Sequence, residues 1–455
     1  MTRTLFLLAL TAVTAGCTTI EPAGSAVSVV HPVAHPIEPR IAFSANPARH
    51  GEPVHVRVTG LQAGAEFVVR AEQLSRWQAD TLYRTEARFQ ADAEGTVDLA
   101  TDAPIEGPWS NADPDALFWT QRIVDEPPPE GLELHAVRVS VRDAGGTELA
   151  EATLDHVPAL ADLEETPLGD EFPGAFVLRR PGSDPRPAVI LLGGSEGNDG
   201  AARGDAPLWA DRGYVAVGLP YYSPAWGDQP QKFPELPRGF ANIPLDTLQE
   251  VRDALRARDD VDADRIGLYG ISKGAEFVLA AASRIDGFAA VAAIVPSDVI
   301  WEGWGAGSTA GETPSFSWQG EPLDFVPYVG IERAIGGVPD DQRVEMRVPH
   351  AEGRAAHPER VEAARIRVED IDEPVFLLGG GRDPVWDSGH MAARIAATRA
   401  EAGLETEALI FAKAGHGISG PPQAPTRSRS IEARRAGWNA LQAFFERTLK
   451  AEPTD

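Results

Sequence analysis

The residues with the clearest chemical potential form the pentapeptide Gly270-Ile-Ser272-Lys-Gly274. It lies between an apolar run at 265–269 and a helical pattern at 275–283, which predicts a sharp strand-to-helix turn with the serine exposed at its tip. Glycines at both ends remove Cβ atoms that would clash with neighbouring backbone, and the helix N-terminus behind the turn favours a developing negative charge. The pentapeptide therefore predicts a serine nucleophile. The simpler interpretation is a glycine-rich loop at a tight packing point.

A serine nucleophile needs a base, and the base needs a carboxylate that fixes its tautomer. Asp383 and His416 each come just after a buried apolar run, in the chain order serine, acid, histidine that this geometry requires. Asp383 is preferred to Asp387 because a glycine-rich turn places it nearest the end of the strand. His416 is preferred to His390 because the latter falls inside a predicted helix. A solvated loop histidine is the alternative interpretation of His416.

The tetrahedral intermediate of such a reaction needs backbone N–H groups that bind its oxyanion. One donor is expected from Lys273, the residue after the nucleophile. A second is expected from Gly194 or Ser195, in the loop 193–197 that follows an apolar run, and either N–H fits the role. The glycine spacing of this loop matches neither a phosphate-binding loop nor a dinucleotide fingerprint, so nucleotide binding is not predicted there.

These residues need a parallel sheet to bring them to one edge, and the pattern of residues 176–450 predicts such a sheet. Continuous apolar runs such as 188–192 and 374–378 alternate there with helical patterns, one of which covers 245–258. Fully apolar strands joined by helices are typical of a parallel sheet that is covered on both faces. We therefore expect an α/β domain over 176–450, with an insertion at 297–370 that carries no clear period.

The residues before this domain follow a different pattern. Between 40 and 158, short alternating runs such as 54–58 and 134–141 are separated by turn signals. This arrangement predicts an N-terminal β-sandwich, joined to the α/β domain by a linker at 159–175. The expected fold class is therefore α/β, a mostly parallel sheet with helices on both faces, preceded by a β-sandwich.

The N-terminus has the features of an export signal. Residues 1–16 contain a basic start, an apolar run too short to cross a bilayer, and small residues before Cys17. The Ala-Gly-Cys ending resembles a bacterial lipobox, so Cys17 is expected to be lipidated and to begin a tether at 17–39. We expect an exported bacterial lipoprotein, anchored to a membrane and facing the periplasm or the cell surface. An ordinary cleaved signal with an incidental cysteine is the alternative.

The composition excludes several classes of protein. The 455 residues carry 68 Asp and Glu against 41 Lys and Arg, a net charge of −27 that repels nucleic-acid phosphates. Cys17 is the single cysteine, which excludes an intrachain disulfide, a cysteine-based zinc site and an iron–sulfur cluster. No metal site, cofactor, nucleic-acid partner or obligate protein partner is predicted.

Several motifs of the chain have counterparts in one known family. They are Gly270-Ile-Ser-Lys-Gly-Ala-Glu276, Tyr221-Tyr222, Gly381-Arg-Asp383 with Trp386, Gly415-His416, and Trp438-Asn-Ala-Leu-Gln-Ala-Phe-Phe445. With them the chain resembles the acyl-CoA thioesterases related to bile acid-CoA:amino acid N-acyltransferase. The resemblance implies a β-sandwich joined to an α/β-hydrolase, with Ser272, Asp383 and His416 as nucleophile, acid and base. The acyltransferase branch has cysteine at the nucleophile, so serine implies water as the acyl acceptor.

The predicted function is therefore that of a serine hydrolase that cleaves acyl thioesters of the acyl-CoA type through an acyl-enzyme. An exported carboxylic-ester hydrolase or peptidase that uses the same three residues is the alternative, favoured by the export signal. A non-catalytic surface lipoprotein is a third interpretation, which the complete set of serine, acid and histidine argues against. The expected partners are a small-molecule acyl thioester or ester and, through the lipid anchor, a membrane.

Overall fold

A computed structural model describes residues 38–75, 80–225, 230–336, 338–339, 342–422 and 430–451. The predicted export signal, Cys17 and all but the end of the predicted tether lie outside these residues. In the part of the chain that the structure describes, no helix has both the length and the apolar character needed to span a bilayer.

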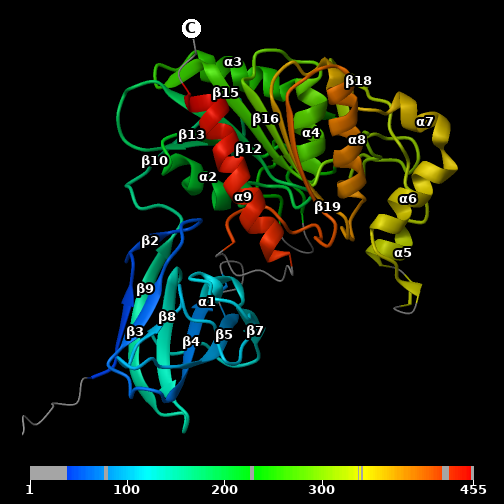
Figure 1. Cartoon of the computed structure of the whole chain (residues 1–455). Helices are drawn as coiled ribbons and strands as arrows, with labels where there is room; N and C mark the ends of the chain where they lie inside the picture. Colours follow the sequence, from blue (N-terminus) through cyan, green and yellow to red (C-terminus); the bar gives the residue numbers. More distant parts are fainter. Residues whose placement is uncertain are drawn as a thin grey trace, which may run out of the picture. The chain divides into compact units, whose positions relative to one another are not determined.

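The N-terminal domain consists of two sheets that share one core (Figure 1). Alternate side chains point inward, as along β3, where Val56 and Val58 are buried and Arg57 between them is exposed. These valines pack in one cluster with Val69 and Val139 of the larger sheet, as expected of a β-sandwich. The smaller sheet is β1 (Arg40–Phe43), β3 (Val56–Thr59) and β6 (Val97–Asp98). The larger sheet is β2 (Ala48–Arg49), β9 (Glu148–Val157), β8 (Ala136–Asp143), β4 (Glu66–Leu74), β5 (Leu82–Gln90) and β7 (Arg122–Val124), and a short helix α1 (Ala116–Trp119) precedes β7.

The second domain is built on an eight-stranded sheet. The strands β13, β12, β15, β16, β19 and β20 of this sheet run parallel to one another. At one edge, β11 pairs antiparallel with β13, and β10 pairs antiparallel with β11. The strands β12, β13, β16 and β19 are buried on both faces, which is why their sequences are continuous apolar runs. In spatial order the strands are β10 (Glu164–Pro167), β11 (Phe176–Arg179), β13 (Val215–Gly218), β12 (Arg186–Leu192), β15 (Val261–Ile271), β16 (Ala290–Ile294), β19 (Val375–Gly380) and β20 (Thr406–Phe411).

Helices cover both faces of this sheet (Figure 1). The helices α2 (Gly200–Ala210) and α9 (Ile431–Phe445) pack on one face, and a π-helical turn at Glu446–Lys450 extends α9. The helices α3 (Thr247–Arg256), α4 (Lys273–Ala282) and α8 (Ser388–Glu401) pack on the other face. The predicted fold class, an α/β-hydrolase preceded by a domain of strands, is therefore confirmed.

The linker predicted at 159–175 is wrong in its middle part. Residues Glu164–Pro167 form β10, which pairs antiparallel with β11 and adds an edge strand to the large sheet. All four residues are exposed, so the strand has no apolar pattern that could reveal it. Backbone pairing with β11 stabilises it, and Glu164 also forms an ion pair with Arg179 at 3.1 Å.

The insertion predicted at 297–370 is a packed part of the second domain. Its residue Trp301 is fully buried and shares a small core with Val299, Trp386 and Met391. Its elements are mostly short and of mixed type, so no one period runs through the segment. They are β17 (Phe316–Trp318), which pairs with β14 (Ile243–Pro244) on one side and with β18 (Glu321–Pro322) on the other, the helices α5 (Glu332–Ile335), α6 (Arg347–Ala356) and α7 (Pro358–Ala363), and a 3₁₀ turn at Val368–Asp370.

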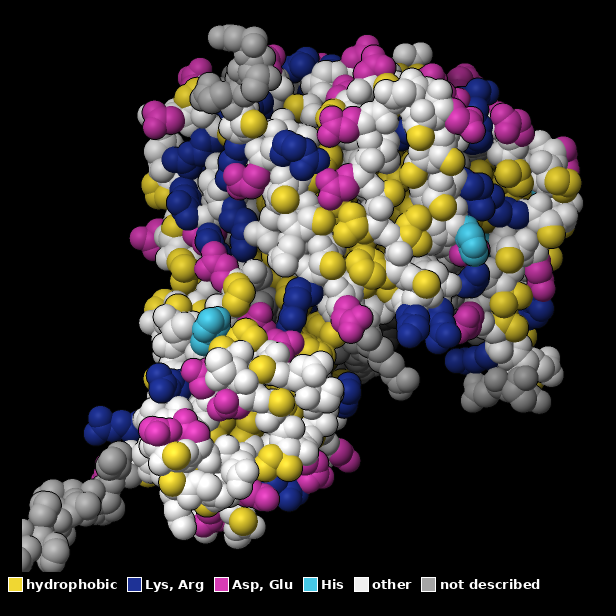
Figure 2. All heavy atoms as spheres, viewed as in Figure 1, with side chains coloured by type: hydrophobic (Ala, Val, Ile, Leu, Met, Phe, Trp, Pro, Cys, Tyr) yellow, Lys and Arg dark blue, Asp and Glu magenta, His cyan; other side chains and the backbone are white. Residues whose placement is uncertain are grey.

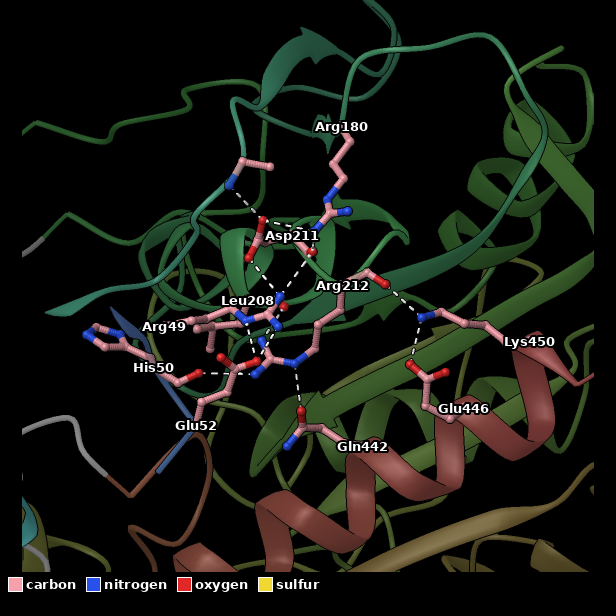
Figure 3. Close-up of polar contacts among 11 residues, drawn as sticks. Arg49, His50, Glu52, Arg180, Leu208, Asp211, Arg212, Gln442, Glu446 and Lys450 are labelled. Atoms are coloured by element: carbon pink, nitrogen blue, oxygen red, sulfur yellow. Dashed lines mark hydrogen bonds and ion pairs between the residues drawn. The ribbon is translucent and has the colours of Figure 1, made fainter. Parts of the chain in front are cut away.

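A buried carboxylate connects the sandwich to the second domain (Figure 3). Asp211, at the end of α2, accepts hydrogen bonds from Arg49 at 2.8 Å and from the backbone N–H of Ala161 at 2.9 Å. Burial alone would raise the pKa of Asp211, but these hydrogen bonds outweigh it and hold the pKa below its usual value. Arg212 extends the network to its partners His50, Leu208 and Gln442.

Charged side chains are distributed over the surface. Figure 2 shows basic and acidic side chains interspersed on the face that it presents, with hydrophobic side chains between them. Many charged side chains of the described residues are paired, for example Arg70 with Glu86 at 2.7 Å and Arg365 with Glu369 at 2.8 Å. Exposed pairs of this kind contribute little to the free energy of unfolding.

Candidate active site

The carboxyl ends of four parallel strands bring the predicted site residues together. The strands β12, β15, β19 and β20 end at the same edge of the sheet, with β16 between β15 and β19. The loops after them carry Gly194, Ser272, Asp383 and His416 respectively. Ligands and reacting groups collect at this edge in open α/β sheets.

Ser272 occupies a strained turn between β15 and α4. Its φ is 57° and its ψ is −118°, a conformation that side-chain-bearing residues rarely adopt. The turn is possible because glycines flank it. A Cβ on Gly270 would lie 2.2 Å from the carbonyl oxygen of Gly274, and a Cβ on Gly274 would lie 2.3 Å from that of Gly193. The glycines therefore let the backbone pack closely around the serine.

We expect the substitution Gly274→Ala to destabilise the protein by about 1–3 kcal/mol or more, because its new methyl group would meet backbone that cannot rotate away. The measurement is the free energy of unfolding from urea titration. The matched control is Gly200→Ala, at the start of α2, where a Cβ meets nothing within 4 Å. A Gly274→Ala variant as stable as that control would show that the turn is not tightly packed.

The three predicted side chains form a hydrogen-bonded chain. The Nε2 of His416 lies 2.9 Å from the Oγ of Ser272, and its Nδ1 lies 2.8 Å from the Oδ2 of Asp383. An ionised carboxylate only accepts hydrogen bonds, so the hydrogen-bond network assigns the proton to Nδ1 and leaves Nε2 free to accept the serine proton. This is the arrangement that a nucleophile, its base and an orienting acid require.

The carboxylate of Asp383 is fully buried and held by four donors. Its Oδ1 accepts the backbone N–H groups of Val385 at 2.9 Å and Trp386 at 3.4 Å. Its Oδ2 accepts His416 and, at 2.6 Å, the hydroxyl of Ser388. Sequence reasoning missed Ser388; a serine at the start of a helix, five residues after the acid, was the available signal.

Asp387 and His390, the alternatives to Asp383 and His416, pair with each other rather than with Ser272. His390 lies on α8 and contacts the Oδ2 of Asp387 at 2.7 Å, and 71% of its side chain is exposed. Asp387 also forms an ion pair with Arg347 at 3.2 Å. Neither rival therefore belongs to the chain of hydrogen bonds at the serine.

The loop after β12 is held beside the serine by two tyrosines. The hydroxyl of Tyr221 donates to the carbonyl oxygens of Gly193 at 2.8 Å and Gly194 at 2.9 Å, and that of Tyr222 donates to Ser195. Lys273 is the first residue of α4, where backbone N–H groups have no partner within the helix. The N–H of Gly194 donates to the Glu196 side chain at 2.9 Å, and the roles of Lys273, Gly194 and Ser195 as oxyanion donors stay predictions.

Two family models match the chain. One, described as the acyl-CoA thioester hydrolase/BAAT N-terminal region, matches residues 51–159. The other, described as the BAAT/acyl-CoA thioester hydrolase C-terminal region, matches residues 243–438, which include Ser272, Asp383 and His416. Together they span more than half of the chain. The chain belongs to the acyl-CoA thioester hydrolase/BAAT family. The predicted family, and the prediction of an enzyme that is a hydrolase, are confirmed.

Curated relatives agree with this membership of the acyl-CoA thioester hydrolase/BAAT family. Acyl-coenzyme A thioesterase 1 of Mus musculus is 26% identical over 429 residues, covering 88% of this chain and 94% of its own. Mitochondrial acyl-coenzyme A thioesterase 2 of Rattus norvegicus is 27% identical over 430 residues, covering 88% and 87%. Among solved structures, the dienelactone hydrolase-like phosphotriesterase P91 gives a TM-score of 0.36 at 15% identity, covering 63% of this chain and 98% of its own. The sequence matches alone establish the family.

The side chain of Lys273 fixes the first turn of α4 in this family member. Its Nζ is buried and donates to Glu276 at 2.7 Å and to the hydroxyl of Ser315 at 2.8 Å. Glu276 in turn accepts the backbone N–H of Trp301 at 3.0 Å. Burial lowers the pKa of Lys273 and raises that of Glu276, and their mutual attraction opposes both shifts. Through their contacts with Ser315 and Trp301, Lys273 and Glu276 connect the turn behind the nucleophile to the insertion. Sequence reasoning missed this role.

A layer of aromatic rings lies behind His416. Its ring packs edge-on against Trp386, with centroids 5.9 Å apart, and Trp386 packs in the same way against His350. His350 is buried, and its Nδ1 lies 2.7 Å from the carbonyl oxygen of Met346. Burial lowers the pKa of His350 to about 4, so this second histidine stays neutral at pH 7.

This depressed pKa predicts a pH dependence of stability. In the unfolded chain His350 takes up a proton below its ordinary pKa of 6.5, whereas in the folded protein it does so only near 4. The stabilisation is therefore complete above about pH 6.5 and is lost as the pH falls toward 4, by about 3 kcal/mol. Over this range we expect the free energy of unfolding of wild type to fall by about 3 kcal/mol more than that of His350→Phe, which has no group to protonate at this position. A difference that does not change with pH would contradict the burial of a neutral histidine.

Proposed function

We propose that this protein hydrolyses acyl thioesters through an acyl-enzyme on Ser272. The observation that carries the proposal is the hydrogen-bonded chain of Ser272, His416 and Asp383, in a protein of the acyl-CoA thioester hydrolase/BAAT family. The family supports the thioester as substrate, and the geometry supports nucleophilic catalysis by serine.

The proposed reaction has two steps. In the first, Nε2 of His416 takes the proton of Ser272 as Oγ attacks the carbonyl carbon; the C–S bond then breaks and His416 protonates the departing sulfur. In the second, His416 takes a proton from water and the water oxygen attacks the acyl carbon; the ester bond to Ser272 then breaks as His416 returns its proton to Oγ, which releases the acid. The N–H of Lys273 and one from the 193–195 loop would bind the oxyanion in both steps.

The test is hydrolysis by a soluble protein that starts after Cys17. Thiol release from a series of acyl-CoA thioesters is compared with p-nitrophenol release from esters of the same acyl chains. We expect the thioesters to have the higher kcat/KM. Ester turnover without thioester turnover would retain the nucleophile and favour the alternative, an exported carboxylic-ester hydrolase. Turnover of neither substrate would contradict both functions.

We also propose that the protein is exported and anchored to a membrane by lipidation of Cys17. The sequence of residues 1–17 is the support for this proposal. In a bacterial host we expect incorporation of labelled fatty acid into the wild-type protein and recovery in the membrane fraction. Equal labelling of a Cys17→Ala variant would contradict lipidation at this residue.

A further inference from the structure

Glu196 places a carboxylate on the loop that was expected to bind the oxyanion. Its Oε1 accepts the backbone N–H of Gly194 at 2.9 Å. Glu196 is an exposed residue, and among the residues that the structure describes no basic side chain forms an ion pair with it. Its hydrogen bond among the described residues is therefore to a backbone donor rather than to a basic side chain.

The carboxylate and the nucleophile border the same small space. A Cβ built on Gly194 would lie 3.0 Å from Oε2 of Glu196 and 3.2 Å from Cβ of Ser272. A Cβ built on Gly193 would lie 2.4 Å from the Oε1 of the same carboxylate. The carboxylate therefore lies over the two glycines, on the side where the loop faces the serine.

A carboxylate in this position resembles the species that the loop should bind. Both a carboxylate and a tetrahedral oxyanion are negatively charged oxygens that accept backbone N–H groups, and they cannot share one donor in a site of this size. Two adjacent negative charges would also repel each other. Glu196 must therefore leave Gly194 before an oxyanion can bind there.

We propose that the Glu196 carboxylate occupies the oxyanion site of the free enzyme, and that the carbonyl oxygen of the substrate displaces it before Ser272 attacks. This inference rests on the proposed function of Ser272. Because Glu196 is exposed, its side chain can rotate into solvent without unfolding the loop. Tyr221, which binds the carbonyl oxygens of Gly193 and Gly194, keeps the loop in place when the carboxylate leaves.

Displacement reduces the apparent affinity for substrate, because only the fraction of molecules with an open site can bind. Removing the carboxylate should therefore raise kcat/KM about three- to tenfold, through a lower KM with kcat unchanged. A carboxylate that only maintains the loop would give the opposite result, since its loss would lower kcat.

Two variants separate occupancy of the site from negative charge. Glu196→Ala removes the charge and leaves the site unoccupied. Glu196→Asp keeps the charge, but its side chain is one methylene group shorter, so its carboxylate lies further from the N–H of Gly194. The substrate is p-nitrophenyl acetate, whose neutrality removes long-range attraction as a cause. We expect both variants to show the increase, and the control Glu250→Ala, on an exposed position of α3, to match wild type.

A second readout makes the result independent of the natural substrate. A fluorophosphonate phosphonylates a reactive serine, because Oγ attacks phosphorus and fluoride leaves, and it places its phosphoryl (P=O) oxygen on the same N–H donors. Labelling of Ser272 should be faster in both Glu196 variants than in wild type. Slower labelling and lower kcat in both variants would overturn the inference. Failure of wild type to hydrolyse any thioester, with faster labelling of the variants, would reject the proposed function and retain the role of Glu196.

Discussion

We expect a Ser272→Ala protein to fold normally and to lose turnover by about 10⁴–10⁶-fold, because the atom that would carry the acyl group is absent. The serine hydroxyl makes its hydrogen bond to His416, at the edge of the sheet rather than in its core. Its removal should therefore leave the free energy of unfolding nearly unchanged. The measurement is kcat on the best thioester of the acyl-CoA series, with urea unfolding as the check on folding.

A residual turnover above about 1% of wild type would contradict nucleophilic catalysis at this residue. Mass spectrometry gives an independent test, since a slowly hydrolysed substrate should add its acyl group to the peptide that contains Ser272. That adduct should be absent from the alanine variant. An adduct on another residue of the same variant would place the nucleophile elsewhere.

The second large effect is expected at Asp383. The substitution Asp383→Asn keeps the size of the side chain but lowers kcat by about 10⁴-fold, because an amide no longer stabilises the imidazolium or selects the proton on Nδ1 of His416. The new NH₂ group would also face a donor, whether from Ser388 or from the backbone of Val385. Kinetics with the thioester measure this loss.

Asp387→Asn is the matched control for that experiment. The residue is four positions away and carries the same charge, but it binds His390 and Arg347 instead of the histidine at the serine. We expect it to keep kcat within about twofold of wild type, as is usual for a partly exposed ion pair. A loss at Asp387 as large as that at Asp383 would mean that the acid is shared or wrongly assigned.

These expectations distinguish groups that react from groups that position them. Ser388 and Trp386 hold the acid, Lys273 and Glu276 hold the turn behind the nucleophile, and Tyr221 holds the loop that faces it. Their loss should therefore cost less activity than the loss of Ser272 or Asp383. Glu196 stands apart, because its loss is expected to increase kcat/KM.

The fold class and the order of the reacting groups along the chain could be predicted from the sequence alone. Continuous apolar runs in the sequence predict a parallel sheet, since the strands of such a sheet are buried on both faces. The sharp turn at Ser272 needs glycines at fixed positions for local steric reasons. Asp383 and His416 could be predicted because each follows its own strand, and strands that run parallel must end at the same edge.

The groups that surround that site could be identified only from the way the elements pack together. The pairing of β10, the contact of Arg49 with Asp211 and the tie between Lys273 and Ser315 join residues far apart in the chain, and no periodicity encodes such contacts. The burial that lowers the pKa of His350 likewise depends on rings from separate elements. The contact of Glu196 with Gly194 spans two residues, yet it needs a loop conformation that packing against the tyrosines of another loop sets. Patterns along a chain report which face of an element is buried, whereas a side chain's partner depends on how the elements pack.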